Sequence, residues 1–121
     1  MELDTRVGLL VSSGTISEDV AATVRKTIQR MEYHWNISLT EENGSRLITH
    51  LAMALMRLSK DKKIEVIEVM ENEHFTEIKK RAAFPKAREI ASDLIVHTGM
   101  DIPQIERDYL ELNVCLVLED A

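Results

Sequence analysis

Apolar side chains recur along most of this chain at the spacing of an α-helix. Near residues 17–34 they follow one another at steps of three or four, which places them on one helical face: Val20, Val24, Ile28, Met31 and Trp35. Thr15 or Ser17 can cap the start. A second stripe predicts a helix at about 41–59 and consists of Leu47, Leu51, Ala54, Leu55 and Leu58. Thr40 is a good N-cap for it, although Asn43-Gly44 is also typical of a turn.

The remaining chain predicts three more helices, with proline and glycine marking their ends. Phe75 and Ile78 indicate a short helix near 72–82, and apolar residues lead into it at Ile64, Ile67 and Met70. Pro85 suits the first residue of a helix at 85–98 that Gly99 stops, and Pro103 opens the last one at 103–118. That last helix carries one apolar face made of Ile105, Tyr109, Leu112 and Leu116.

No segment shows the alternation of a strand between hairpin turns, so we expect an all-α fold, a compact bundle of about five helices. The 121 residues suffice for one domain, residues 1–121, and we find no internal boundary.

Composition argues against several classes of function. Aromatic residues make up 4% of the chain and the net charge is -6, which argues against a nucleic-acid-binding surface. The lone Cys115 lies in an apolar run, where a thiol behaves as a small hydrophobic group and has no partner for a disulfide. The N-terminus is unlike a secretory signal and no stretch has transmembrane length, so we expect a cytoplasmic protein without membrane contact.

His50 is the main candidate for chemistry. Arg46, His50 and Arg57 share one strip of the predicted helix at 41–59, because successive residues turn by about 100°. The strip flanks the apolar stripe, which predicts a half-buried imidazole, and Arg57 leans back toward it. A neutral imidazole near guanidinium groups suits phosphoryl acceptance, although a histidine at such an edge is more often a structural residue.

Three segments resemble the phosphotransferase-system regulation domain (PRD) family. The stretch LITHLAMALMRL, residues 47–58, is similar to its first-histidine motif. Phe84-Pro85 followed by Glu89-Ile90-Ala91 resembles a second segment, and DIPQIERDYL, residues 101–110, resembles a third. They occur in the family's order, and the resemblance extends over about residues 10–118.

The resemblance implies a five-helix regulatory bundle, commonly a homodimer, that is not an enzyme and needs no cofactor or metal. Such domains accept a phosphoryl group on histidine from the phosphocarrier protein or from a sugar permease's cytoplasmic domain, and they control antiterminators and transcription activators. By family position His50 is the phosphoacceptor and Arg57 supports the phosphate. By the same family position, Glu106, Tyr109 and Asn113 are second-rank candidates for the same surface.

The chain departs from the family in two ways. PRD modules normally come in pairs beside an RNA- or DNA-binding domain, and no such domain is visible in this length or charge. The second histidine belongs seven residues after Glu106, where this chain has Asn113. An asparagine imitates one imidazole nitrogen in hydrogen bonding but cannot accept a phosphoryl group.

The sequence therefore predicts a stand-alone PRD-like module in which a phosphotransferase-system protein phosphorylates His50, acting on transcription through a protein partner. The alternative is a degenerate interaction module that dimerises without being phosphorylated. A small enzyme or metal-binding protein is a third class, which would need His50 to converge with Glu106 or His97 in a pocket. Glu71, Glu73 and His74 are possible metal ligands, although their spacing matches no metal motif. His34 and His97 are expected to serve as polar groups at helix ends.

Overall fold

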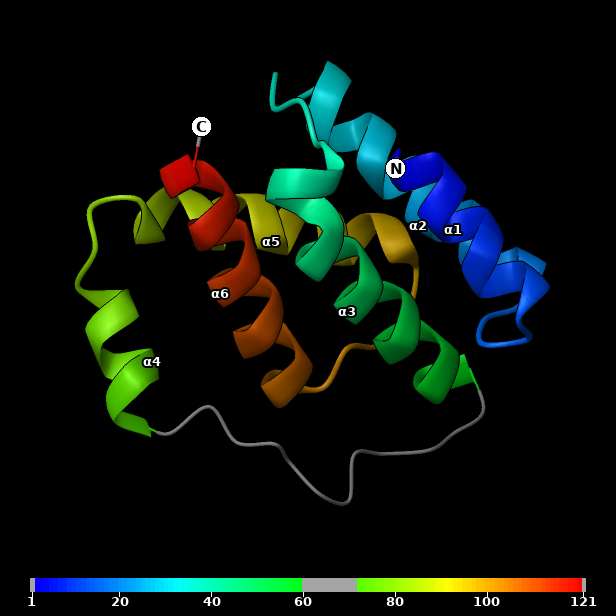
Figure 1. Cartoon of the computed structure of the whole chain (residues 1–121). Helices are drawn as coiled ribbons and strands as arrows, with labels where there is room; N and C mark the ends of the chain where they lie inside the picture. The colour runs from blue at the N-terminus through cyan, green and yellow to red at the C-terminus, as the bar shows by residue number, and fades with distance from the viewer. Residues whose placement is uncertain (1, 60–71, 121) are drawn as a thin grey trace.

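A computed structural model describes residues 2–59 and 72–120, without the side chains of residues 72–75 and 120. The described residues contain no strand and form a bundle of six helices (Figure 1). They are α1 (Leu3–Ser12), α2 (Glu18–Tyr33), α3 (Glu41–Ser59), α4 (Asn72–Lys79), α5 (Phe84–Thr98) and α6 (Gln104–Asp120). The predicted all-α class is confirmed.

Helix α1 is the element that the apolar pattern missed, and it raises the expected five helices to six. Its buried residues are Leu3 and Val7, and it packs against α2 and α3. Two buried positions one turn apart are too few to reveal a helical stripe in the sequence. Tertiary packing stabilises this short helix, since isolated helices of such length are marginal in water.

The starts of α2 and α3 are capped by side chains. The Ser17 hydroxyl accepts a hydrogen bond from the Val20 amide at 3.2 Å. At α3, the hydroxyl of Thr40 accepts from the Asn43 amide and the Asn43 side chain accepts from the Thr40 amide at 2.7 Å. This reciprocal pair resembles a capping box. Of the two alternatives, a helix capped by Thr40 or a turn at Asn43-Gly44, the structure has the capped helix, and Asn43 lies inside it.

Gly44 lets another segment approach the first turn of α3 closely. A Cβ atom at this position would lie 3.2 Å from side-chain atoms of both Leu3 and Leu39. The glycine is therefore explained by packing, despite its cost of about 1 kcal/mol in a helix interior.

The later helices lie near their predicted positions. The helix predicted at 72–82 ends at Lys79, and α5 begins one residue before Pro85, which stands in its first turn. Gly99 ends α5 with a left-handed φ of 68°. The leading residues Ile64, Ile67 and Met70 lie outside the described residues, as does the side chain of Phe75.

Helix α6 packs against three other helices, α3, α4 and α5 (Figure 1). Every residue from 110 to 115 is buried. The predicted apolar face of this helix is incomplete: Leu112 is buried and Tyr109 and Leu116 pack against the core, but the fully enclosed Val114 and Cys115 lie outside that face. A helix covered on several sides has no single apolar face, so a search for one face misplaces its core.

An ion cluster joins α2 to α5 at the edge of the core. The Asp93 carboxylate accepts hydrogen bonds from Nε and Nη2 of Arg30, both at 3.0 Å, and from Nε1 of Trp35 at 2.9 Å. The hydrogen bond from Arg30 is the main reason that the pKa of Asp93 falls to about 2. Nδ1 of His97 lies 2.8 Å from the backbone oxygen of Asp93. This cluster fixes the two helices side by side.

Within the described part of the chain, the helices are too short or too polar to cross a lipid bilayer.

Candidate phosphoacceptor site

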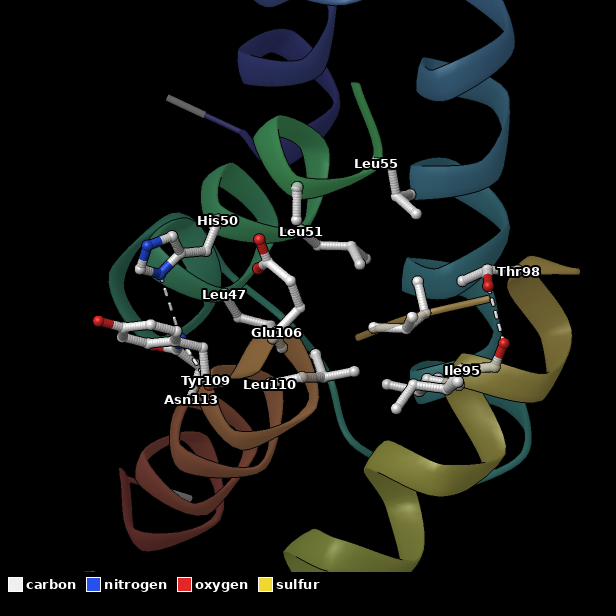
Figure 2. Close-up of a pocket in the computed structure, with 13 residues that line it drawn as sticks. Leu47, His50, Leu51, Leu55, Ile95, Thr98, Glu106, Tyr109, Leu110 and Asn113 are labelled. Carbon is white, nitrogen blue, oxygen red and sulfur yellow. Dashed lines mark hydrogen bonds between the residues drawn. The ribbon is translucent and has the colours of Figure 1, made fainter. Parts of the chain in front are cut away.

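His50 lies on the outer side of α3, at the rim of a hollow between α3, α5 and α6 (Figure 2). Its side chain is exposed, so the expected half-burial is corrected. The neighbours Leu47 and Leu51 point into the core and are buried. Helix α6 meets one side of the imidazole and leaves the other side to solvent.

Three residues of α6 face this part of α3. Glu106, Tyr109 and Asn113 are three and four positions apart, which places them on one side of a helix. They line the same hollow as His50. The structure thus brings together His50 and all three residues that family position assigned to its surface.

The imidazole makes its contacts with α6 through one face and one nitrogen. Nδ1 of His50 lies 3.4 Å from Nδ2 of Asn113, which also donates to the Tyr109 backbone oxygen at 2.9 Å. The rings of His50 and Tyr109 are 5.3 Å apart and tilted by 48°. The other imidazole nitrogen, Nε2, has no hydrogen-bond partner among residues 2–59 and 72–120.

Arg57 is held by Glu106. Nη2 of Arg57 donates to Oε1 of Glu106 at 2.8 Å, and the Glu106 side chain is only 8% exposed. Nε of Arg57 is buried and has no hydrogen-bond partner in the described chain. The guanidinium that was expected to meet a phosphate on His50 thus neutralises a buried carboxylate, and one of its donors is unused.

The hollow beside His50 is small and mainly apolar. Its volume is about 30 Å³, whereas pockets for drug-sized molecules measure about 300–1,000 Å³. It has room for a few water molecules at most. A group that reacts with His50 therefore approaches its ring from outside this hollow.

A wider, polar groove continues from the same place along α3 and α6. It has a volume of about 560 Å³, and Asn113 belongs to both depressions. Arg46 lines the groove, is exposed, and has no ion-pair partner in the described residues. On the opposite side Arg81 pairs with Glu119 at 2.5 Å. Sequence reasoning placed Arg46 on the strip of His50 but had no signal for Arg81, which comes from another part of the chain.

The other candidates lie elsewhere. His34 contacts the ring of Trp35, and His97 belongs to the Asp93 cluster. In the described residues no three His, Cys, Asp or Glu side chains gather at metal-binding distance. The proposed ligands Glu71, Glu73 and His74 lie outside the described side chains. Burial raises the pKa of the Cys115 thiol.

The fold and site define an all-helical bundle with an exposed histidine between two helices. The sequence profile of the PRD domain matches residues 25–114, and the chain belongs to the PRD domain family. That span includes His50, Arg57, Glu106, Tyr109 and Asn113. The PRD family is a family of regulatory domains.

A protein of Escherichia coli (strain K12), named uncharacterized protein YhfY, is 25% identical to this chain over 112 residues. The similar region covers 93% of this chain and 91% of that protein. No solved structure matches the chain.

Proposed function

We propose that His50 accepts a phosphoryl group from a protein of the sugar phosphotransferase system, and that the chain is a regulatory module acting on transcription through a protein partner. The observation that supports this most is the position of His50. Its imidazole is exposed at a helix surface, held by α6 on the Nδ1 side and open at Nε2. A donor protein can reach such a nitrogen without opening the core.

Charged side chains near His50 would respond to a phosphoryl group on its ring. A phosphoryl group adds about two negative charges. Glu106 lines the same hollow and is buried, so the added charge repels it, while Arg57 is attracted to both anions. Phosphorylation therefore competes with the ion pair that links α3 to α6. Arg46, which has no ion-pair partner in the described chain, is a second cation on this strip.

The test is phosphorylation by a reconstituted relay of the general phosphotransferase proteins with labelled phosphoenolpyruvate. We expect acid-labile, base-stable label on the wild type and none on His50→Ala. His34→Ala is the matched control, because His34 is also exposed and its ring contacts Trp35 instead of a residue of α6. Equal labelling of the wild type and His50→Ala would exclude His50 as the acceptor.

A second candidate function is an interaction module that is never phosphorylated. Asn113 at the place of the family's second histidine favours it, as does the engagement of Arg57 by Glu106. Absence of label on all three proteins would support this function. An enzymatic or metal-binding role is the weakest candidate, and we propose that the chain is not an enzyme.

We further propose that the module is cytoplasmic and acts as a homodimer without contacting nucleic acid itself. The donor is the phosphocarrier protein or the cytoplasmic domain of a sugar permease. A dimer should bury more than about 1,000 Å² in total. Sedimentation equilibrium at micromolar concentration should give twice the chain mass, and a monomer mass would contradict the dimer.

A further inference from the structure

The side-chain amide of Asn113 has a defined orientation. Its Nδ2 lies 2.9 Å from the backbone oxygen of Tyr109, one turn earlier on α6. A carbonyl oxygen only accepts hydrogen bonds, so the amino group and not the amide oxygen must face it. Because Asn113 is only 4% exposed, few water molecules compete for that group.

The same amino group determines which nitrogen of His50 carries the proton. Nδ2 has two hydrogens, so one is directed to Tyr109 and the other is available to Nδ1 of His50 at 3.4 Å. A ring nitrogen that faces a donor presents its lone pair, and the proton of the neutral imidazole then sits on Nε2. The distance is at the long end of the range, so the contact biases the tautomer without locking it.

The nitrogen that faces solvent is therefore the one without a lone pair. Nε2 is the atom that a partner can reach, because Nδ1 is turned toward α6 (Figure 2). The 3.4 Å between Nδ1 and Asn113 is too short to hold a phosphoryl group. Attack through Nε2 thus requires the other tautomer, with the proton on Nδ1.

We propose that Asn113 is a positioning residue that holds His50 in the tautomer unable to attack through Nε2, and that it thereby slows phosphoryl acceptance. This inference rests on the proposed role of His50. For the reaction, the Asn113 amide rotates to present Oδ1 to a proton on Nδ1 and gives up its hydrogen bond to Tyr109. The loss of one hydrogen bond corresponds to about a two- to tenfold smaller reactive population.

The transfer step forms one phosphorus–nitrogen bond and breaks another. The lone pair of Nε2 forms a bond to phosphorus, and the phosphorus–nitrogen bond of the donor's phosphohistidine breaks. Its electron pair returns to the donor nitrogen. The proton on Nδ1 of His50 stays in place, accepted by Oδ1 of Asn113.

Nitrogen NMR of the full chain with ¹⁵N-labelled histidine tests the tautomer directly, at a pH where the imidazole is neutral. We expect His50 to carry its proton on Nε2 in the wild type and on Nδ1 in Asn113→Asp, because a carboxylate only accepts. His34 should give the same signals in both proteins. Histidine in water already prefers the proton on Nε2, so the change of tautomer in Asn113→Asp shows whether residue 113 controls the proton position.

A wild-type His50 protonated mainly on Nδ1 would overturn the proposal without any variant. So would an unchanged tautomer in a folded Asn113→Asp protein, with folding checked by circular dichroism.

The kinetic arm uses Asn113→Leu, which removes the amide without adding charge. In the phosphotransferase relay we expect this variant to be labelled about two- to tenfold faster than the wild type. An equal or slower rate, with normal circular dichroism, would overturn the proposed slowing. If neither protein is labelled, the proposed function fails and with it the slowing, whereas the NMR result still reports the tautomer.

Discussion

Two polar clusters lie at the edge of the same core, and they differ in how completely their groups are paired. Around Asp93, both carboxylate oxygens accept hydrogen bonds, and Arg30 and Trp35 donate to them at 2.9 to 3.0 Å. Around His50, the contact to Asn113 is 3.4 Å long and Nε2 has no hydrogen-bond partner in the described chain. Both carboxylate oxygens of Asp93 are hydrogen-bonded, whereas the imidazole of His50 has one nitrogen facing solvent.

This difference separates a structural use of polar residues from a functional one. Hydrogen bonds to a charged group contribute more than bonds between neutral groups, so a saturated carboxylate stabilises the pairing of α2 with α5. The exposed Nε2 of His50 adds little to stability and can be reached from outside, whereas the buried Nε of Arg57 has no partner in the described chain and lowers stability. Mutations in the two clusters should therefore affect different properties.

The largest expected effect is the loss of stability in Asp93→Ala. Arg30 and Trp35 would lose their shared acceptor, and we expect the free energy of unfolding to fall by about 2–3 kcal/mol. Urea denaturation measures it. Asp101→Ala is the control, since Asp101 is exposed and should change stability by less than about 0.5 kcal/mol. Equal effects of the two substitutions would contradict the assignment.

Acid should weaken the Asp93 cluster. The pKa of Asp93 is lowered from 3.8 to about 2, so its stabilising contribution is present above about pH 4 and is lost as the pH falls through 2. The stability difference between the wild type and Asp93→Ala should therefore shrink between about pH 5 and pH 2. Urea denaturation at several pH values checks this, and a difference that grows toward acid would give the prediction the wrong sign.

A smaller effect is expected for the ion pair beside the candidate site. Arg57→Leu leaves the buried Glu106 carboxylate without its cation, and we expect a loss of about 1–2 kcal/mol because Arg57 itself is partly exposed. Replacing Glu106 by Leu in the same chain should recover most of it. Arg46→Leu, on the same helix, is the control and should be nearly neutral. An additive double mutant would show that the pair is not coupled.

The smallest effect on stability is expected for His50→Ala. The side chain is exposed and its hydrogen-bond contact is long, so the free energy of unfolding should change by less than about 0.5 kcal/mol. The same urea series measures it. A loss above about 1.5 kcal/mol would mean that His50 is a structural residue, which is the ordinary explanation for a histidine at the edge of a helix.

The sequence predicted the helices whose apolar stripe faces one neighbour. Steps of three and four residues located α2 and α3, and Pro85 and Gly99 bounded α5 to within one residue. It failed where burial does not follow one stripe. Helix α1 has only two buried residues, Leu3 and Val7, and α6 is enclosed on several sides.

The candidate site was predicted only in part. Helical spacing placed Arg57 on the strip of His50, but it could not show that Glu106, 49 residues away, pairs with it. Such a pairing depends on how α3 crosses α6, which no local pattern encodes. The placement of Asn113 opposite His50 came from resemblance to a family and not from spacing.

The enclosure of α6 has a consequence for the motions of the molecule. Backbone amides exchange with solvent slowly where opening exposes much apolar surface, and fast where local fluctuations suffice. Residues 110–115 are all buried, so their amides should exchange only through global unfolding, whereas α1 can fray at much lower free energy. His50 therefore faces a helix whose central segment should open only when the whole fold opens. The proposed phosphorylation of its ring should therefore leave the backbone of residues 110–115 in place and be accommodated by side chains on the exposed side of α3.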